Sequence, residues 1–251
     1  MSFSQTTYDA PMHAVILAGG RGVRLRPYTT AFPKPLVPIG DEYAIIEIVL
    51  RQLRDHGFTR VTIAIGHLGQ LIRAYCGDGS QWGLSIDYWS EDEPLGTMGP
   101  IVSNLAGLPD HFLVMNGDVL TDLDYRGLLE GHVASGAPLT VATYDRVVKI
   151  DFGVLEIGGE GDEHIVAFRE KPVEHFSVSM GVYAASRETL SEYEAGKPLG
   201  FDELVLDLLD SATPPRVHPF SGYWLDIGRP DDYDQANEEW NELRALLLPS
   251  T

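Results

Sequence analysis

The residues best suited to chemistry lie between Met12 and Gly40, in the run MHAVILAGGRGVRLRPYTTAFPKPLVPIG. This stretch contains no Asp or Glu, although the whole chain carries 37 acidic residues against 18 Lys and Arg. Glycines let backbone N–H groups approach an anion, and Arg and Lys side chains match phosphate oxygens. We therefore predict a site for a polyanion here. Its central residues are Gly19, Gly20, Gly22, Arg24 and Lys34.

Two common phosphate-binding loops do not fit the stretch. The dinucleotide fingerprint G-x-G-x-x-G needs a third glycine where Leu25 stands, and the P-loop ending G-K-[ST] is absent. Neither NAD binding nor P-loop chemistry is therefore favoured. The plainer alternative is that the glycines only form a tight turn from a strand to a helix, with the arginines solvated.

A carboxylate follows a second apolar run. His111 to Met115 is predicted to be a strand, and Asn116, Gly117 and Asp118 come directly after it. Ligands of open α/β sheets bind outside the carboxyl ends of the strands, so Asp118 is well placed to hold a metal. Taken alone, however, Asn-Gly-Asp is more often a simple turn.

The run GGRGVRLRPYTTAFPKPLVPIG resembles the signature of the sugar-1-phosphate nucleotidyltransferases, which join a nucleoside triphosphate to a sugar 1-phosphate. Further segments resemble motifs of the same family, and the resemblance extends from Met12 to about Asn237. These segments are EDEPLGT, NGD, FGVLEI, REKP, SMGVYAAS and GYWLDIGRPDDY.

The resemblance implies a role for individual residues. Nucleotide binding is implied for Leu17, Ala18, Gly19, Gly20, Gly22, Val23, Arg24, Gly96 and Thr97. Sugar-phosphate binding is implied for Asn116, Gly153, Glu170, Lys171 and Gly181. Two acids, Asp118 and Asp226, would hold Mg²⁺, a hard cation that prefers oxygen ligands. The catalytic set would be Arg24, Lys34, Asp118, Lys171 and Asp226.

Several residues depart from the family pattern. Val23 stands where the family has Thr or Ser, so one hydroxyl contact to the nucleotide is absent, although a backbone N–H there is retained. The other departures are Tyr28, Met98, Pro100, Phe152, Ser179 and Arg229.

The resemblance leaves the substrates open. It is nearest to mannose-1-phosphate guanylyltransferases, which would use GTP, because of the short form of the chain and the EDEPLGT segment. Glucose-1-phosphate adenylyl-, thymidylyl-, uridylyl- and cytidylyltransferases follow closely, and a cyclitol phosphate can stand in for the sugar phosphate. A noncatalytic subunit that senses a sugar nucleotide is an alternative of a different class. The third hypothesis for the function is a nicotinamide-dependent oxidoreductase.

The elements that must position these residues alternate between strand and helix. Apolar runs of strand length at 12–18, 60–65, 84–89, 111–115 and 139–144 are separated by helical patterns, which indicates parallel strands with crossover helices. We predict an α/β, Rossmann-like three-layer αβα fold with a mixed, mostly parallel sheet. Three successive strands, at 152–157, 165–169 and 177–184, should form a small β-rich sugar-binding lobe.

Helix boundaries follow from capping residues. Asp41 is predicted to cap a helix that ends near Asp55, and Thr97 one that ends near Gly107. A single long helix is predicted over 230–247. We expect a flexible N-terminal segment, residues 1–11, before one nucleotidyltransferase domain over residues 12–251. Residues 12–145 would bind the nucleotide, and residues 146–251 would bind the sugar and carry the C-terminal helix.

Composition narrows the classes of partner. A net charge of −19 and a pI of about 4.6 argue against nucleic-acid binding. The histidines and Cys76 form no zinc pattern, and a lone cysteine fits a reducing compartment. No signal peptide or membrane-spanning run is recognised, so we expect a cytoplasmic protein without a membrane partner. A homo-oligomer is compatible with the sequence.

Overall fold

The computed structural model describes residues 10–90, 94–159, 161 and 163–249, so most of the predicted flexible segment 1–11 and part of the EDEPLGT segment lie outside it. None of its helices is long and apolar enough to cross a bilayer. The helices and strands, in chain order, are β1 (His13–Ala18), β2 (Pro38–Ile39), β3 (Tyr43–Ala44), α1 (Ile45–Asp55), β4 (Arg60–Ile65), α2 (Gly69–Cys76), β5 (Ser85–Ser90), α3 (Gly99–Ser103), β6 (His111–Asn116), β7 (Val119–Thr121), α4 (Tyr125–Ser135), β8 (Leu139–Lys149), β9 (Val154–Ile157), β10 (Ile165–Arg169), β11 (Val173–Ser186), α5 (Arg187–Leu190), α6 (Phe201–Leu209), β12 (Arg216–Phe220), β13 (Trp224–Asp226), α7 (Pro230–Glu238) and α8 (Trp240–Leu247).

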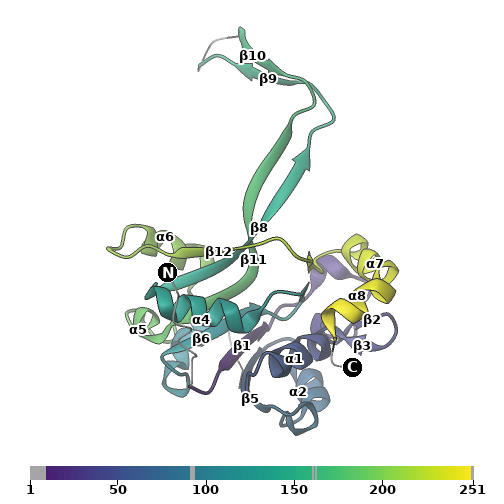
Figure 1. Cartoon of the computed structure of the whole chain (residues 1–251), viewed down its shortest axis with the longest axis vertical. Coiled ribbons are helices and arrows are strands. Elements are labelled where there is room, and N and C mark those ends of the chain that lie inside the picture. Colours follow the sequence, from purple (N-terminus) through teal and green to yellow (C-terminus); the bar gives the residue numbers. More distant parts are fainter. Residues whose placement is uncertain (1–9, 91–93, 160, 162, 250–251) are drawn as a thin grey trace, which may run out of the picture.

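The central sheet has the strand order β12-β8-β11-β6-β1-β4-β5 within the described residues (Figure 1). Strand β11 runs antiparallel to both of its neighbours, β6 and β8. The other neighbouring pairs are parallel. The prediction of a mixed, mostly parallel sheet is therefore confirmed.

Helices cover both faces of the sheet because its strands are apolar on both sides. In β1, Ala14 and Ile16 join a core with α1, α2 and α4, whereas Val15 joins a second core with α3, α5 and α6. In β6 the alternation repeats, with Leu113 in the first core and Val114 in the second. This arrangement confirms the three-layer αβα prediction.

A third core lies beneath the loop that follows β1. It joins Leu25 of that loop, Ile227 after β13, and Trp240 and Leu243 of α8. The prediction of one long helix over 230–247 is wrong, because α7 ends at Glu238 and α8 begins at Trp240. The break lets Trp240 pack against Gly40, where a Cβ atom would lie 1.9 Å from the indole ring.

Two predicted caps are also wrong. Asp41 lies in the turn between β2 and β3 with φ of 57°, and α1 begins only at Ile45. The helix after Thr97 begins at Gly99, with Met98 at its N-cap and Pro100 in its first turn. In both places the chain first makes a turn that is fixed by longer-range packing, so the nearest capping residue does not mark the helix start.

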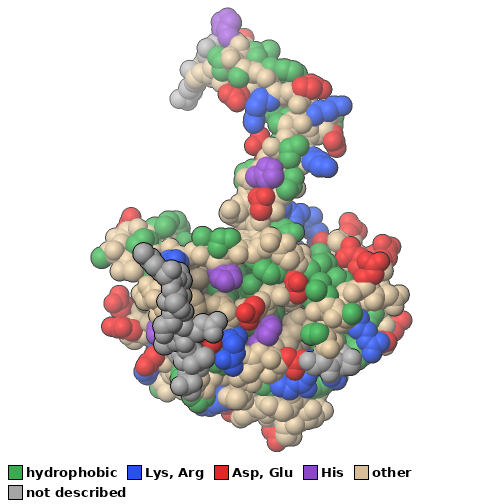
Figure 2. Space-filling model, viewed as in Figure 1, with side chains coloured by type: hydrophobic (Ala, Val, Ile, Leu, Met, Phe, Trp, Pro, Cys, Tyr) green, Lys and Arg blue, Asp and Glu red, His purple; other side chains and the backbone are tan. Residues whose placement is uncertain are grey.

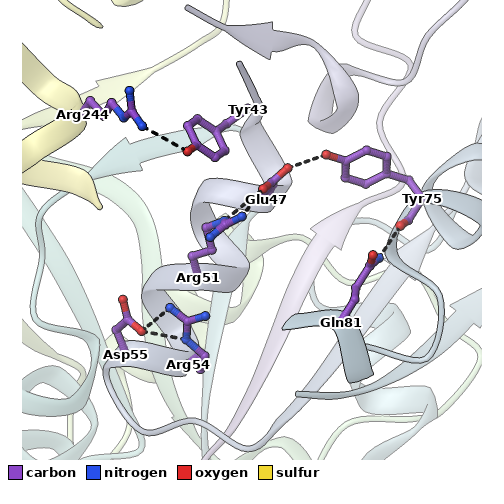
Figure 3. A network of polar contacts seen from close by, with 8 residues as sticks. All are labelled: Tyr43, Glu47, Arg51, Arg54, Asp55, Tyr75, Gln81 and Arg244. Carbon is purple, nitrogen blue, oxygen red and sulfur yellow. Dashed lines mark hydrogen bonds and ion pairs between the residues drawn. The ribbon is translucent and has the colours of Figure 1, made fainter. Parts of the chain in front are cut away.

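Helix α1 is held to its neighbours by a polar network (Figure 3). Glu47 accepts hydrogen bonds from Arg51 Nε at 2.9 Å and from the Tyr75 hydroxyl of α2 at 2.5 Å. Burial, followed by the bond to Glu47, raises the pKa of Tyr75, so its hydroxyl keeps its proton as the donor. The opposite flank of α1, with Ile45 and Ile48, packs into the third core under the loop. The network therefore fixes a helix that supports the loop after β1.

A β-ribbon projects from the sheet (Figure 1). Strands β8 and β11 continue to pair well beyond the sheet, with Asp145 opposite Ser177 and Lys149 opposite Val173, and β9 and β10 form its outer end. We call residues 145–178 the arm. Two of the three strands predicted for the β-rich lobe, at 152–157 and 165–169, thus stand away from the layered part of the molecule, which we call the body. Most of the third, predicted at 177–184, lies in the body instead, where Val182 to Ala184 of β11 pair with β6 in the central sheet.

Candidate functional site

The loop after β1 is folded tightly. Gly22 has φ of 59°, and its carbonyl accepts hydrogen bonds from the Leu25 N–H at 3.0 Å and the Thr29 hydroxyl at 2.7 Å. A Cβ atom on Gly22 would lie 3.0 Å from Thr29 Cγ2 and 3.3 Å from Lys34 Cβ. Only glycine fits this left-handed, crowded position without strain. Gly22 therefore brings Lys34 back beside the glycine loop.

Sheet register brings the two predicted carboxylates together. Strand β6 lies beside β1, and the Gly117 N–H donates to the Leu17 carbonyl at 3.0 Å, so Asp118 follows at the carboxyl edge of the sheet. Strand β13 pairs with β7 and sets Asp226 opposite Val119. The Ile227 N–H then donates to the Asp118 carbonyl at 3.1 Å. The two acids meet although they are distant in the chain.

Lys34 lies between these carboxylates. Its Nζ is 2.5 Å from Asp118 Oδ2 and 4.0 Å from Asp226 Oδ1. Lys34 is buried, with only 7% of its surface exposed, so its attraction to the acids is weakly screened. Asp118 is partly buried and Asp226 is exposed, so the lysine compensates chiefly the charge of Asp118.

Two features of the acid pair bear on metal binding. Asp118 Oδ1 is buried and has no hydrogen-bond partner among the described residues. Burial, then the charge of Asp118, raises the pKa of Asp226, while Lys34 and Arg24 oppose the rise. The described residues contain no cluster of three or more His, Cys, Asp or Glu that could hold a metal. Two carboxylates suit Mg²⁺, which completes its shell with waters and substrate phosphates.

Two adjoining pockets open at this edge of the sheet, and Leu17, Gly20 and Asp118 line both. The smaller, of about 290 Å³, is also lined by Ala18, Gly22, Val23, Arg24, Lys34, Pro35, Gly117 and Gly228. The larger, of about 750 Å³, is also lined by Gly19, Arg21, Ala64, Gly66, His67, Pro94, Gly96, Thr97 and Asn116. The structure thus brings together all nine residues predicted to bind the nucleotide.

Some lining residues were not predicted, and topology could have indicated them. Gly66 and His67 follow the carboxyl end of β4, which is the neighbour of β1. A Cβ atom on Gly66 would lie 2.7 Å from the Gly19 carbonyl oxygen, so the two loops nearly touch. The rule that ligands bind at the carboxyl edge applies to β4 as much as to β6. Gly228, which lies two residues after Asp226, was not predicted either, although it belongs to the GYWLDIGRPDDY segment that resembles a family motif.

The predicted sugar-phosphate residues fall into two groups. Asn116 and Gly181 lie in the body, where a Cβ atom on Gly181 would lie 2.5 Å from Asn116 Nδ2. Gly153, Glu170 and Lys171 lie together on the arm, and the Cβ position of Gly153 is 3.3 Å from Glu170 Oε2. None of these three lines either pocket. The structure therefore does not bring them to the acid pair.

The site separates two kinds of charge. The glycine loop offers exposed backbone and Arg24 without any acid, and the carboxyl ends of β6 and β13 offer two acids. Such a division suits phosphate groups on one side and a divalent cation on the other. The family model described as "Nucleotidyl transferase" matches residues 13–242.

The chain belongs to the nucleotidyl transferase family. A UTP–glucose-1-phosphate uridylyltransferase from Synechocystis is 32% identical over 256 residues, covering 94% of this chain and 63% of the relative. A mannose-1-phosphate guanylyltransferase from Mycobacterium tuberculosis is 31% identical over 238 residues, covering 90% and 64%. This family member thus spans a little under two thirds of the length of these relatives.

A solved structure supports the fold of this family member. HddC from Yersinia pseudotuberculosis superimposes with a TM-score of 0.71 at 26% sequence identity. The match covers 91% of this chain and 99% of HddC. The architecture of the nucleotidyl transferase domain is therefore shared along almost the full length of both chains.

Proposed function

We propose that the chain transfers a nucleoside monophosphate from a nucleoside triphosphate to a sugar 1-phosphate, or to a sugar-like phosphate, and releases pyrophosphate. The observation that carries the proposal is Lys34, held between Asp118 and Asp226 beside an acid-free glycine loop. Family membership supports this reaction class. We further propose one domain over residues 12–251, supported by strands of both halves, 12–145 and 146–251, that pair in the central sheet.

The proposed reaction needs charge compensation more than proton transfer. A phosphate oxygen of the sugar 1-phosphate attacks the α-phosphorus, the bond from that phosphorus to the pyrophosphate oxygen breaks, and pyrophosphate leaves. The nucleophile is anionic at neutral pH, so no protein base is required. Two unit charges 4 Å apart repel by about 4 kcal/mol at an effective dielectric of 20. Offsetting this repulsion is the main task of the site.

Each residue has a part in that task. Arg24 and Lys34 would bind the triphosphate, with Lys34 stabilising the charge that develops at the α-phosphorus. The N–H groups of the glycine loop would orient the phosphates for in-line attack. Asp118 and Asp226 would hold Mg²⁺, which supplies positive charge to both substrates when bound. Lys171 and Glu170 lie on the arm, so to take part their side chains would have to reach the pocket from there.

GTP and mannose 1-phosphate are the first substrate pair that we propose. Similarity to a guanylyltransferase supports them, and similarity to a uridylyltransferase keeps glucose 1-phosphate and other bases as alternatives. Pyrophosphate release from a matrix of nucleoside triphosphates and sugar 1-phosphates tests the choice. We expect Mg²⁺-dependent release with one dominant pair. A location in the cytoplasm and the absence of a nucleic-acid partner stay predictions.

Two variants test the site directly. Asp118→Asn and Lys34→Ala should each reduce turnover at least a hundredfold while circular dichroism shows an intact fold, and Arg26→Ala, an exposed residue outside both pockets, is the matched control. Near-normal rates in both site variants would refute the assignment.

A noncatalytic sensor of sugar nucleotides is the second candidate. The observation that favours it is that Glu170 and Lys171 belong to the arm and line neither pocket. Binding of nucleotide by equilibrium dialysis, without pyrophosphate release from any substrate pair, would support this candidate over the enzyme.

A further inference from the structure

The turn between β13 and α7 is fixed beside the smaller pocket. Gly228 lines that pocket, and a Cβ atom at this glycine would lie 3.7 Å from both Arg24 Nη1 and Asp226 Oδ2. The Ile227 side chain before it is fully buried in the third core. The Gly228 N–H donates to the Asp226 carbonyl at 2.7 Å. The chain therefore leaves the acid pair along a fixed path, and Arg229 is the first exposed residue after Asp226.

Arg229 is a poor residue for the place it occupies in α7. It is the N-cap, where Ser, Thr, Asn and Asp are preferred because their side chains accept a hydrogen bond from the first turn. An arginine side chain has only donors, and it makes no capping bond here. Its positive charge also lies at the N-terminus of the helix, where the helix dipole disfavours a cation. Local stability therefore does not explain an arginine at this position.

Asp232 supplies the cap that Arg229 cannot. Its Oδ2 accepts hydrogen bonds from the Arg229 N–H at 2.7 Å and from the Gly228 N–H at 3.1 Å. This carboxylate serves backbone N–H groups, so it holds the turn rather than the Arg229 guanidinium. The backbone from which the Arg229 side chain extends is thereby fixed at the edge of the smaller pocket.

The Arg229 guanidinium has no ion pair or hydrogen bond within the described part of the chain. Its surroundings are nevertheless acidic, and Figure 2 shows acidic side chains gathered where Figure 1 labels α7. The acids of this helix are Asp231, Asp232, Asp234 and Glu238. Elsewhere on the body, arginines such as Arg51, Arg126 and Arg244 do form ion pairs with acids. An arginine without a partner in such surroundings is available to an anionic ligand.

Two arginines that line the pockets share this property. Arg21 at the larger pocket and Arg24 at the smaller one also have no ion pair among the residues described. A guanidinium without a protein partner keeps its fork of donors for phosphate oxygens. The smaller pocket also contains Asp118 Oδ1, a buried atom without a hydrogen-bond partner in the described residues, which a bound ion can satisfy. Arg229 therefore resembles Arg24, which is proposed to bind the triphosphate.

We propose that Arg229, together with Arg24, binds the two terminal phosphates of the triphosphate, the part that leaves as pyrophosphate. This inference rests on the proposed function and adds a phosphate-binding residue to the same site. The two arginines start from neighbouring points, since Arg24 Nη1 lies close to Gly228, and their planar forks match oxygens of adjoining phosphate groups. A cation there offsets the negative charge that accumulates on the leaving group as its bond to the α-phosphorus breaks.

The pockets favour the triphosphate over the sugar 1-phosphate as the ligand of Arg229. The smaller pocket, which Gly228 lines, is formed by the glycine loop with Arg24 and Lys34. Asn116, for which sugar-phosphate binding is implied, lines only the larger pocket. The arginine at the turn after Gly228 therefore lies on the triphosphate side of the site.

Binding of inorganic pyrophosphate tests the inference without any turnover. Isothermal titration calorimetry with Mg²⁺ present compares the native chain with Arg229→Thr, which removes the cation and restores a preferred N-cap residue. We expect the dissociation constant to rise about tenfold, which corresponds to about 1.4 kcal/mol, while the melting temperature stays the same or rises. Arg229→Lys keeps the charge without the fork, so its loss should be smaller, about threefold.

Arg216→Thr is the matched control. Arg216 is exposed, lines neither pocket and has no ion pair among the described residues, so its variant should bind pyrophosphate as the native chain does. A second set of titrations uses mannose 1-phosphate and glucose 1-phosphate, which offer the same phosphate chemistry from the other substrate. Their affinities should not change in Arg229→Thr.

Three outcomes would overturn the inference: unchanged pyrophosphate binding in Arg229→Thr, an equal loss in Arg216→Thr, or a loss that falls on the sugar 1-phosphates instead. Each of these outcomes leaves the proposed function standing, because the native chain still binds pyrophosphate. A native chain that binds no pyrophosphate would refute the proposed function as well, so the two proposals can be told apart.

Discussion

At the residue scale, Lys34 takes the place of a cation before any substrate binds. Its ammonium group contacts Asp118 and lies 4.0 Å from Asp226, while the buried Asp118 Oδ1 has no hydrogen-bond partner in the part of the chain that the structure describes. The same lysine is proposed to bind the triphosphate. It cannot hold the acids and a distant phosphate with equal strength, so binding of a metal at the acids should free Lys34 for the nucleotide. Metal and nucleotide would then favour each other's binding.

The exchange of Lys34 for a metal ion at the two acids predicts the effect of removing the lysine charge. In Lys34→Met, the acid pair loses its internal cation, and we expect Mg²⁺ to bind about tenfold more tightly in the absence of nucleotide, which corresponds to about 1.4 kcal/mol. Isothermal titration calorimetry at pH 8, well above the ordinary pKa of a carboxyl group, measures the change. Arg26→Met, which removes an exposed charge from the same loop, should leave the affinity unchanged. Equal or weaker Mg²⁺ binding by Lys34→Met would contradict the exchange.

At the element scale, the shape of the loop after β1 depends on Gly22 more than on Gly20, the other glycine compared in this loop. Gly22 has a left-handed φ of 59° and contacts Thr29 and Lys34 closely, whereas a Cβ atom on Gly20 would have nothing within 4 Å. Gly22→Ala should therefore cost about 1–2 kcal/mol and lower the melting temperature by about 4 °C. Gly20→Ala should leave it unchanged. Thermal unfolding followed by circular dichroism compares the two, and equal melting temperatures would refute this role of Gly22.

The strands of the body could be predicted from the sequence, whereas several helix boundaries could not. The strands of the body were predictable because runs such as Arg60 to Ile65 are apolar and are bounded by turns, and Asp118 could be placed because it ends one of them. Helix starts near Asp41 and Thr97 were wrong, since distant packing there overrides the local capping preference. The break before Trp240 depends on Gly40, a residue from the other end of the chain.

The site was likewise predictable in part. Residue types indicated a phosphate loop and two acids, but the place of Lys34 between those acids depends on the fold of the loop around Gly22. The position of Lys171 on the arm was not predictable either. Alternation identifies strands such as β9 and β10, but it does not say whether the sheet they form packs on the body or leaves it.

At the scale of the whole molecule, added salt should act in opposite directions on stability and on nucleotide binding, because it screens the self-repulsion of a chain with net charge −19 and also the attraction of Arg24 and Lys34 for the nucleotide. Excess like charge destabilises the compact state, and added salt shortens the Debye length from about 30 Å at 0.01 M to about 10 Å at 0.1 M. We therefore expect the melting temperature to rise by several degrees between about 0.01 and 0.5 M KCl. Nucleotide affinity, which depends on Arg24 and Lys34, should fall over the same range. A fluorescent nucleotide titration and thermal unfolding in matched buffers measure both. Screening saturates once the Debye length is short, so a rise that stays linear to high salt, or no rise, would show that self-repulsion does not limit stability.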